Sequence, residues 1–204
     1  MSTNTAGTLL LAAQSLCLER GGRELFRDLS FAVHGGQLWQ IDGPNGAGKT
    51  SLIRILCGLV RYGYAGHVQR PVPQLYVGHH PAVKALLTPR ENLAWHVSGA
   101  GLYTDGQIES ALARVGLYGY EDVPSHTLSA GQHRRVNLAR LFLSSAPVWL
   151  LDEPFTAIDK SGIDELQSLM AGHVAAGGAV VMTSHQTLRV NFEVRFLHLA
   201  GSVT

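Results

Sequence analysis

The spacing of apolar positions changes along this chain and divides it into three parts. In the first part, apolar and polar residues alternate in short runs, which predicts β-strands. We expect these strands at residues 9–13, 16–19, 25–33, 67–70 and 74–77. From Thr88 to Ser145 the spacing becomes that of amphipathic helices. We expect one helix to start at Thr88 and two others to span residues 105–115 and 129–143.

The last part alternates between strands and helices. Apolar runs at residues 148–151 and 179–183 predict strands buried on both faces, and residues 161–174 between them have helical spacing. A last strand is expected at residues 196–199. This order predicts the α/β fold class, with a mostly parallel sheet core and an N-terminal antiparallel β section. The helical stretch, at about residues 82–146, is expected to form a subdomain inserted into a single domain of residues 1–204.

Composition excludes some classes of protein and leaves the predicted fold unchanged. The chain has 204 residues, of which 46% are hydrophobic and 15% charged, as in a globular protein with one sizeable core. Its formal net charge of +1 gives no indication of a nucleic-acid partner, which usually requires a strongly basic face. Cys17 and Cys57 lack the spacing of metal ligands. Since no apolar run is long enough to cross a bilayer, we expect a soluble cytoplasmic protein that another subunit holds at any membrane.

The most specific motif follows an apolar run at residues 38–41. Residues 43–50 match the pattern G-x-x-x-x-G-K-[ST], between a predicted strand and a predicted helix. The glycines let backbone N–H groups point inward at phosphate oxygens, Lys49 adds a positive charge, and Thr50 offers a hydroxyl to Mg²⁺. The following helix directs its positive end at the same anion. The candidate phosphate-binding residues are Gly43, Pro44, Asn45, Gly46, Ala47, Gly48, Lys49, Thr50 and Ser51.

Two carboxylates, Asp152 and Glu153, end the apolar strand predicted at residues 148–151. Beside a phosphate loop, Asp152 is expected to bind Mg²⁺, and Glu153 to polarise the water that attacks the terminal phosphate. Without that loop, the pair would equally fit a strand end with solvated acids. Earlier in the chain, Ser129 is expected to cap a helix whose free N–H groups can bind an anion. Taken alone, Ser129 is simply a helix cap.

Five motifs lie in the order and spacing of the ATP-binding subunits of ABC transporters, so the chain resembles this family over most of its length. The motifs are residues 43–50, 128–132, 148–154, 157–159 and His185. The resemblance implies a P-loop NTPase fold of the ABC ATPase type and a head-to-tail homodimer with two ATP molecules at the interface. Each ATP would contact the phosphate loop of one subunit and Ser129, Gly131 and Gln132 of the other, with Asp159 at the interface. Catalysis would then depend on Lys49, Glu153 and His185, the last of which would contact the γ-phosphate.

Two positions depart from the usual pattern of that family. His80 stands where these subunits commonly have a glutamine that touches Mg²⁺ and the attacking water. Because a neutral imidazole can accept a hydrogen bond or bind a metal and loses both abilities when protonated, we expect slower or more pH-sensitive hydrolysis. Arg20 replaces the aromatic residue that usually stacks on adenine. Its guanidinium plane can stack on a base, and an ordinary solvated charge in a turn is the alternative.

Several segments resemble, more narrowly, the ATP-binding subunits of the haem exporter used in cytochrome c maturation. These segments are residues 39–43, 77–84, 87–93 and 152–159, together with Ala130. The resemblance implies integral membrane partners from the cytochrome c maturation system and a place on the cytoplasmic face of the bacterial inner membrane. Direct haem binding by this chain is not expected, since His79 and His80 are adjacent in sequence. The alternatives are an ATPase subunit for another small-molecule transporter, and a nucleotide-gated interaction module with little turnover.

Overall fold

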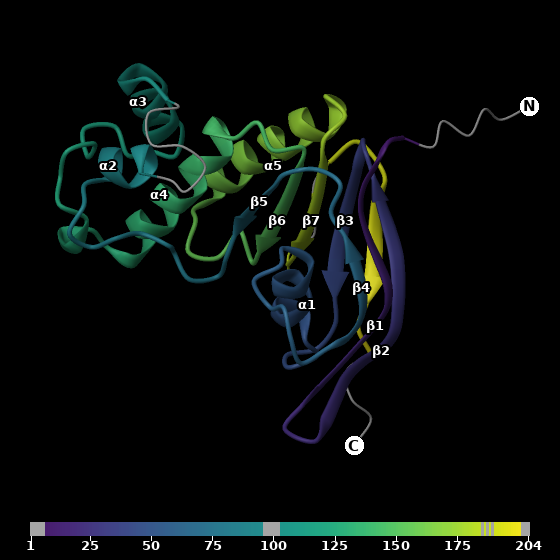
Figure 1. The fold of residues 1–204 in the computed structure, drawn as a ribbon. Coiled ribbons are helices and arrows are strands. Elements are labelled where there is room, and N and C mark those ends of the chain that lie inside the picture. Colours follow the sequence, from purple (N-terminus) through teal and green to yellow (C-terminus); the bar gives the residue numbers. More distant parts are fainter. Residues whose placement is uncertain (1–6, 96–102, 185, 187, 189, 201–204) are drawn as a thin grey trace, which may run out of the picture. The chain divides into compact units, whose positions relative to one another are not determined.

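The computed structural model describes residues 7–95, 103–184, 186, 188 and 190–200 (Figure 1). These residues divide into two compact units. The first unit takes its residues from 1–76, 146–153 and 170–204, and the second from 77–145 and 154–169. Each unit is described separately below. In the described part of the chain, no helix has both the length and the apolar character needed to span a membrane.

The N-terminal part of the first unit is an antiparallel sheet with the strand order β2-β1-β4. Its strands are β1 (Leu9–Arg20), β2 (Arg23–His34) and β4 (Ala65–Gln69). The sequence predicts two strands where the structure has the single strand β1, so that prediction was wrong. Pairing with β2 shifts register between Ala13 and Leu16, and Ser15 has a φ of 48°. A β-bulge, rather than a chain break, therefore interrupts the alternation of apolar residues.

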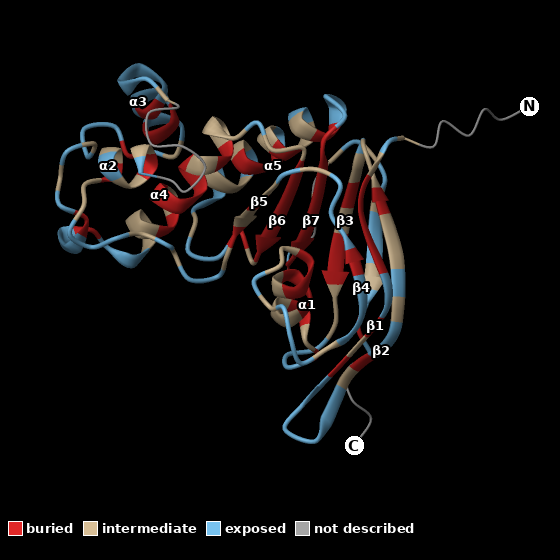
Figure 2. Cartoon of the chain, viewed as in Figure 1, coloured by how far each residue is buried: buried red, intermediate tan, exposed pale blue. Residues whose placement is uncertain are grey.

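The second sheet of the first unit has the strand order β5-β6-β7-β3-β8. Its strands are β5 (Gln74–Val77), β6 (Val148–Asp152), β7 (Ala179–Thr183), β3 (Gln37–Asp42) and β8 (Val194–His198). The pairs β6–β7, β7–β3 and β3–β8 are parallel, as predicted. Figure 2 shows β6 and β7 buried along their whole length, which explains their continuous apolar sequence. Helix α1 (Lys49–Leu56) packs against both strands.

The second unit is helical and has its own apolar core. It contains α2 (Pro89–Ala94), α3 (Asp105–Arg114), the 3₁₀ turn η1 (Ser125–Thr127), α4 (Ala130–Leu143) and the first part of α5 (Lys160–Ala175). Thr88, Thr104 and Ser129 each form a capping box with the residue three positions later. The helix starts predicted at Thr88 and Ser129 are thus confirmed.

Candidate active site

The phosphate loop connects β3 to α1, and its glycines have backbone angles that other residues rarely adopt. The φ angles of Gly43, Gly46 and Gly48 are 142°, 82° and 96°. A Cβ atom on Gly43 would lie 2.4 Å from the carbonyl oxygen of Leu199, and one on Gly48 would lie 3.1 Å from Cβ of Leu25. Leu25 thus packs directly on the loop, a role that its place in a predicted strand does not indicate. The loop conformation depends on glycine at these positions.

Lys49 begins α1 and is buried, with 9% of its surface exposed. Its Nζ donates hydrogen bonds to the carbonyl oxygens of Gly43, at 2.6 Å, and Pro44, at 3.2 Å. Both acceptors are neutral and belong to the loop itself, so the ammonium lies within the curl of the backbone. A buried positive charge beside a helix N-terminus is a suitable environment for phosphate. The loop therefore fits the triphosphate of a nucleotide.

Three hydroxyl and carboxylate groups meet next to this loop, at the end of β6. Asp152 is fully buried, and its Oδ1 accepts hydrogen bonds from Thr50 Oγ1 at 3.1 Å and from Thr183 Oγ1 at 2.9 Å. The described residues contain no cluster of three or more His, Cys, Asp or Glu side chains that could hold a metal. One carboxylate and one hydroxyl nevertheless suit Mg²⁺, which keeps several waters and completes its shell with phosphate oxygens. Thr50 and Asp152 therefore fit the metal role predicted for them.

Glu153, the next residue, has a strained backbone. Its φ of 51° lies in the left-handed region, which costs about 1–3 kcal/mol for a residue other than glycine. The backbone N–H of Glu153 donates to Thr183 Oγ1 at 2.9 Å, so the hydroxyl that donates to Asp152 also accepts from Glu153. The backbone therefore leaves the extended conformation of β6 directly after Asp152, at Glu153.

The second unit contains the predicted sites at the start of α4. Ser129 Oγ accepts from the backbone N–H of Gln132 at 3.2 Å, and the Gln132 side chain accepts from the N–H of Ser129 at 2.8 Å. The Gln132 side chain is thus engaged in the capping box. A Cβ atom on Gly131 would lie 3.6 Å from the carbonyl oxygen of Ala157, which brings the motif at residues 157–159 next to the start of α4.

Asp159 is held by two neighbours in this unit. Its Oδ1 accepts from Arg135 at 2.8 Å, and its Oδ2 accepts from the hydroxyl of Ser161 at 2.8 Å. The hydrogen bond from Ser161 is the main reason why the pKa of Asp159 lies below its usual value, and the charge of Arg135 adds to the effect. Asp159 is therefore a fixed, ionised carboxylate on the surface of the second unit.

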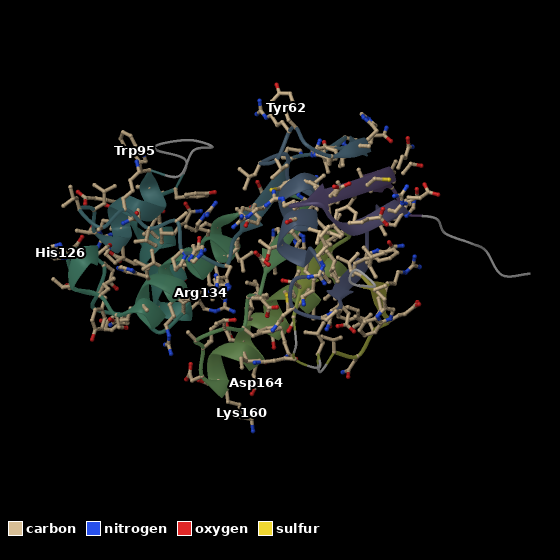
Figure 3. All side chains as sticks on the ribbon, turned by 90° about the horizontal axis from the view of Figure 1, so that it is seen from below. Tyr62, Trp95, His126, Arg134, Lys160 and Asp164 are labelled. Atoms are coloured by element: carbon tan, nitrogen blue, oxygen red, sulfur yellow. The ribbon has the colours of Figure 1, made fainter. Side chains whose placement is uncertain are left out.

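His80 lies exposed in the loop that follows β5, with its ring centroid 5.2 Å from that of His79. The loop backbone is fixed by Arg134, a buried residue of α4 (Figure 3). Its guanidinium donates to the carbonyl oxygens of Gly78 and, at 3.2 Å, of His79. Sequence reasoning missed Arg134, since only its place in the helix after Ser129 could have drawn attention to it.

Two predicted residues remain, Arg20 and His185. Arg20 ends β1 and is exposed, paired with Arg23 across the turn at Gly21 and Gly22. His185 lies outside the described residues. The structure thus brings together the phosphate loop, Asp152 and Glu153 in the first unit, and Ser129, Gly131, Gln132 and Asp159 in the second.

Comparison with known proteins defines the class to which this fold and this loop belong. A sequence model of the ABC transporter family matches residues 26–156, which contain the phosphate loop, the start of α4 and the Asp152–Glu153 pair. The chain belongs to the ABC transporter family.

The relatives of the chain within this family are more specific. It is 51% identical over 190 residues to the cytochrome c biogenesis ATP-binding export protein CcmA of Pseudomonas savastanoi pv. phaseolicola, covering 87% of this chain and 89% of the relative. The protein of the same name from Hahella chejuensis is 49% identical over 209 residues and covers 97% and 99% of the two chains. The chain thus groups with the cytochrome c biogenesis ATP-binding export proteins, as the resemblance in the sequence predicts.

A solved structure confirms the predicted fold class. This structure is a dimeric ATP-binding cassette in a post-hydrolysis state, bound to ADP and Pi. It matches the present chain with a TM-score of 0.81 at 20% identity, and the match covers 94% of each chain. At this level of identity the comparison supports the ABC ATPase fold, with its parallel and antiparallel sheets, and nothing beyond the fold.

Proposed function

We propose that this chain is the ATP-hydrolysing subunit of an export system that serves cytochrome c biogenesis, with haem export or release as the work it drives. The observation that carries the proposal is the meeting of Thr50, Asp152 and Glu153 at a phosphate loop, in a chain that groups with ATP-binding export proteins. Phosphoryl transfer to water requires positioning and charge neutralisation more than covalent chemistry, and this site supplies both.

The residues of the first unit have distinct roles in this proposal. Lys49 and the loop N–H groups bind the β- and γ-phosphates, while Thr50 and Asp152 hold Mg²⁺. The metal, when bound, supplies further neutralisation of the phosphate charge. Glu153 orients and polarises the attacking water. Residues 43–48 and Ser51 shape the loop around the phosphates, Arg20 stacks on the base, and His185 contacts the γ-phosphate.

A second copy of the chain completes the site in this proposal. The start of α4 leaves backbone N–H groups without helical partners, so it attracts an anion. The chain therefore carries two places for phosphate, the loop and this helix start. In a head-to-tail homodimer, Ser129, Gly131 and Gln132 of one copy contact the nucleotide held by the other copy. The ionised Asp159 then lies at the interface between them.

Residues 1–204 form one ATP-binding domain in this proposal, with the helical subdomain at about residues 82–146. The dimer binds integral membrane subunits of the cytochrome c maturation system on the cytoplasmic face of the inner membrane, and no nucleic acid takes part. The helical subdomain and the loop of His80 transmit opening and closing of the dimer to these subunits. His80 contributes to the metal and water site in place of the usual glutamine.

Purification from native membranes tests the proposal. The tagged full chain is extracted in mild detergent, the spanning subunits that accompany it are identified, and phosphate release is measured with and without them. We expect spanning subunits of the cytochrome c maturation system and ATP hydrolysis that they stimulate. Recovery of the membrane subunits of another transporter would contradict the assignment of haem as the cargo. Tight nucleotide binding with no phosphate release would favour a nucleotide-gated interaction module.

A further inference from the structure

The hydroxyl of Thr183 lies between the two carboxylate residues of the site. Thr183 is the last residue of β7, and it is directly opposite Asp152 in the parallel register with β6. Its Oγ1 donates to Asp152 Oδ1 at 2.9 Å and accepts from the backbone N–H of Glu153 at 2.9 Å. A single side chain thus contacts the residue that fits the metal and the residue that fits water activation.

The position of Thr183 in the sheet makes its hydroxyl unusual. Val180, Val181, Met182 and Thr183 are all fully buried, and valine has nearly the shape of threonine. A buried hydroxyl is costly unless it is hydrogen-bonded, so a strand in the centre of a sheet normally carries an apolar β-branched residue here. In this chain the hydroxyl is used both as donor and as acceptor. Its two partners explain the presence of threonine where packing alone would favour valine.

The hydrogen bond between Thr183 and Glu153 lies in a strained segment of backbone. A left-handed φ at a residue other than glycine persists only where its surroundings impose it. The N–H of Glu153 donates a hydrogen bond to Thr183 Oγ1. The hydroxyl of the neighbouring strand therefore helps to hold the backbone of Glu153 in this conformation.

We propose that Thr183 is a positioning residue that fixes Asp152 and Glu153 relative to each other, so that the metal and the attacking water are held in one geometry. This inference rests on the proposed function and adds a residue to that site. Thr183 touches neither nucleotide nor water in the proposal. It acts through its hydrogen bonds to the two residues that do.

Two substitutions separate the hydroxyl from the shape of the side chain. Thr183→Val keeps the volume and the β-branch and removes the hydroxyl, while Thr183→Ser keeps the hydroxyl and removes a methyl group. Residues that hydrogen-bond to a metal ligand typically contribute about 10–100-fold to activity or metal affinity. We therefore expect Thr183→Val to lower kcat by about that factor. Thr183→Ser should recover most of the lost turnover.

Two further measurements do not depend on turnover. In the nucleotide-free full chain, hydrogen exchange of the Glu153 amide should accelerate in Thr183→Val and not in Thr183→Ser, because only the valine variant removes the acceptor. Calorimetric titration of ATP should show weaker binding of Thr183→Val in Mg²⁺ and unchanged binding in EDTA. Thermal unfolding of both variants controls for a general loss of structure.

The outcomes distinguish this inference from the proposed function. If the wild-type chain bound ATP without hydrolysing it, the proposed function would fail, while amide exchange and Mg²⁺-dependent binding would still decide the role of Thr183. An unchanged exchange rate of the Glu153 amide in Thr183→Val would overturn the inference. So would equal losses of turnover in the valine and serine variants, since keeping the hydroxyl in Thr183→Ser would then bring no benefit.

Discussion

Arg134 on α4 donates a hydrogen bond to the carbonyl oxygen of His79, 3.2 Å away, and a second one to the carbonyl of Gly78. The helix that begins at Ser129 is thus tied to the backbone of the loop that carries His80. Arg134 is 3% exposed, so these bonds form in a low-dielectric environment where charged donors are strong. Helix α4 and the loop of His80 have separate roles in the proposed function. These hydrogen bonds connect the two segments inside the second unit.

Replacement of Arg134 should loosen this loop. Arg134→Gln is expected to lower the free energy of unfolding by about 1–3 kcal/mol, because the carbonyl oxygens of Gly78 and His79 lose a charged donor. Arg134→Lys should recover only part of the loss, since an ammonium lacks the planar fork of a guanidinium. Urea denaturation and hydrogen exchange over residues 78–80 measure the two effects. Arg114→Gln is the matched control: its ion pair with Glu165 is exposed, so its removal should cost less than about 1 kcal/mol.

Glu153→Gln tests the role of the carboxylate in water activation. The amide keeps the size of the side chain but cannot act as a base, so ATP binding should persist while turnover falls by about 10²–10⁴-fold. Phosphate release under saturating ATP and calorimetric ATP affinity measure the two quantities. Glu193→Gln, at an exposed carboxylate of the same unit, should leave both unchanged. Normal hydrolysis in Glu153→Gln would remove Glu153 from the proposed role.

The same variant tests the homodimer. Because Glu153→Gln should bind ATP without consuming it, the nucleotide should remain between the two copies and keep them together. Light scattering of the Glu153→Gln chain should then show a dimer with ATP and a monomer without nucleotide. A strictly monomeric chain at saturating ATP, also when bound to its membrane partners, would contradict the assignment of Ser129 and Gly131 to the neighbouring nucleotide.

The parts of the site that the sequence predicts are those encoded by local spacing. The phosphate loop depends on glycines at positive φ within one short segment, and the capping boxes at Thr88 and Ser129 involve residues only three positions apart. Buried strands such as β6 could be predicted because both faces are covered, which leaves a continuous apolar run. The bulge at Ser15 could not, since a bulge interrupts the alternation of apolar residues as a turn would.

Contacts between distant segments could not be predicted from one sequence. Thr183 is an ordinary β-branched residue in an apolar strand, and its role emerges only when the register places it opposite Asp152. Arg134 resembles any basic residue near a helix start until the fold brings it to the loop at Gly78 and His79. The roles of Arg20 and His185 remain predictions, to be tested by substitution.

The glycines of the phosphate loop should differ in their tolerance of alanine. Gly43→Ala is expected to lower the free energy of unfolding by about 2–5 kcal/mol, because left-handed strain adds to a clash with the backbone at Leu199. Gly46→Ala meets open space, so only the strain of about 1–2 kcal/mol remains. Gly106→Ala, inside α3 with ordinary φ, should instead stabilise the chain by about 0.5–1 kcal/mol. Denaturant unfolding gives all three values, and equal effects of Gly43→Ala and Gly46→Ala would contradict the clash.

His173 should make the stability of the first unit depend on pH. Its ring stacks on Trp149 with centroids 3.8 Å apart, and its Nε2 lies 3.2 Å from the carbonyl oxygen of Pro147. Burial lowers the pKa of His173 below its ordinary value, although hydrogen bonds to the backbone of Pro147 and Ala179 oppose the shift. The folded chain therefore binds fewer protons than the unfolded chain in the interval between the lowered pKa and the ordinary one.

The sign of the effect follows from this difference in bound protons. The contribution of His173 is fully present above the unfolded value of about 6.5 and is lost as pH falls through the folded pKa, so stability should decrease on mild acidification. Urea unfolding at several pH values between about 7 and 5 measures the slope. His173→Phe keeps an aromatic ring against Trp149 and cannot titrate, so the dependence on pH should become shallower. An identical slope in His173→Phe and wild type would show that other groups cause the loss of stability in acid.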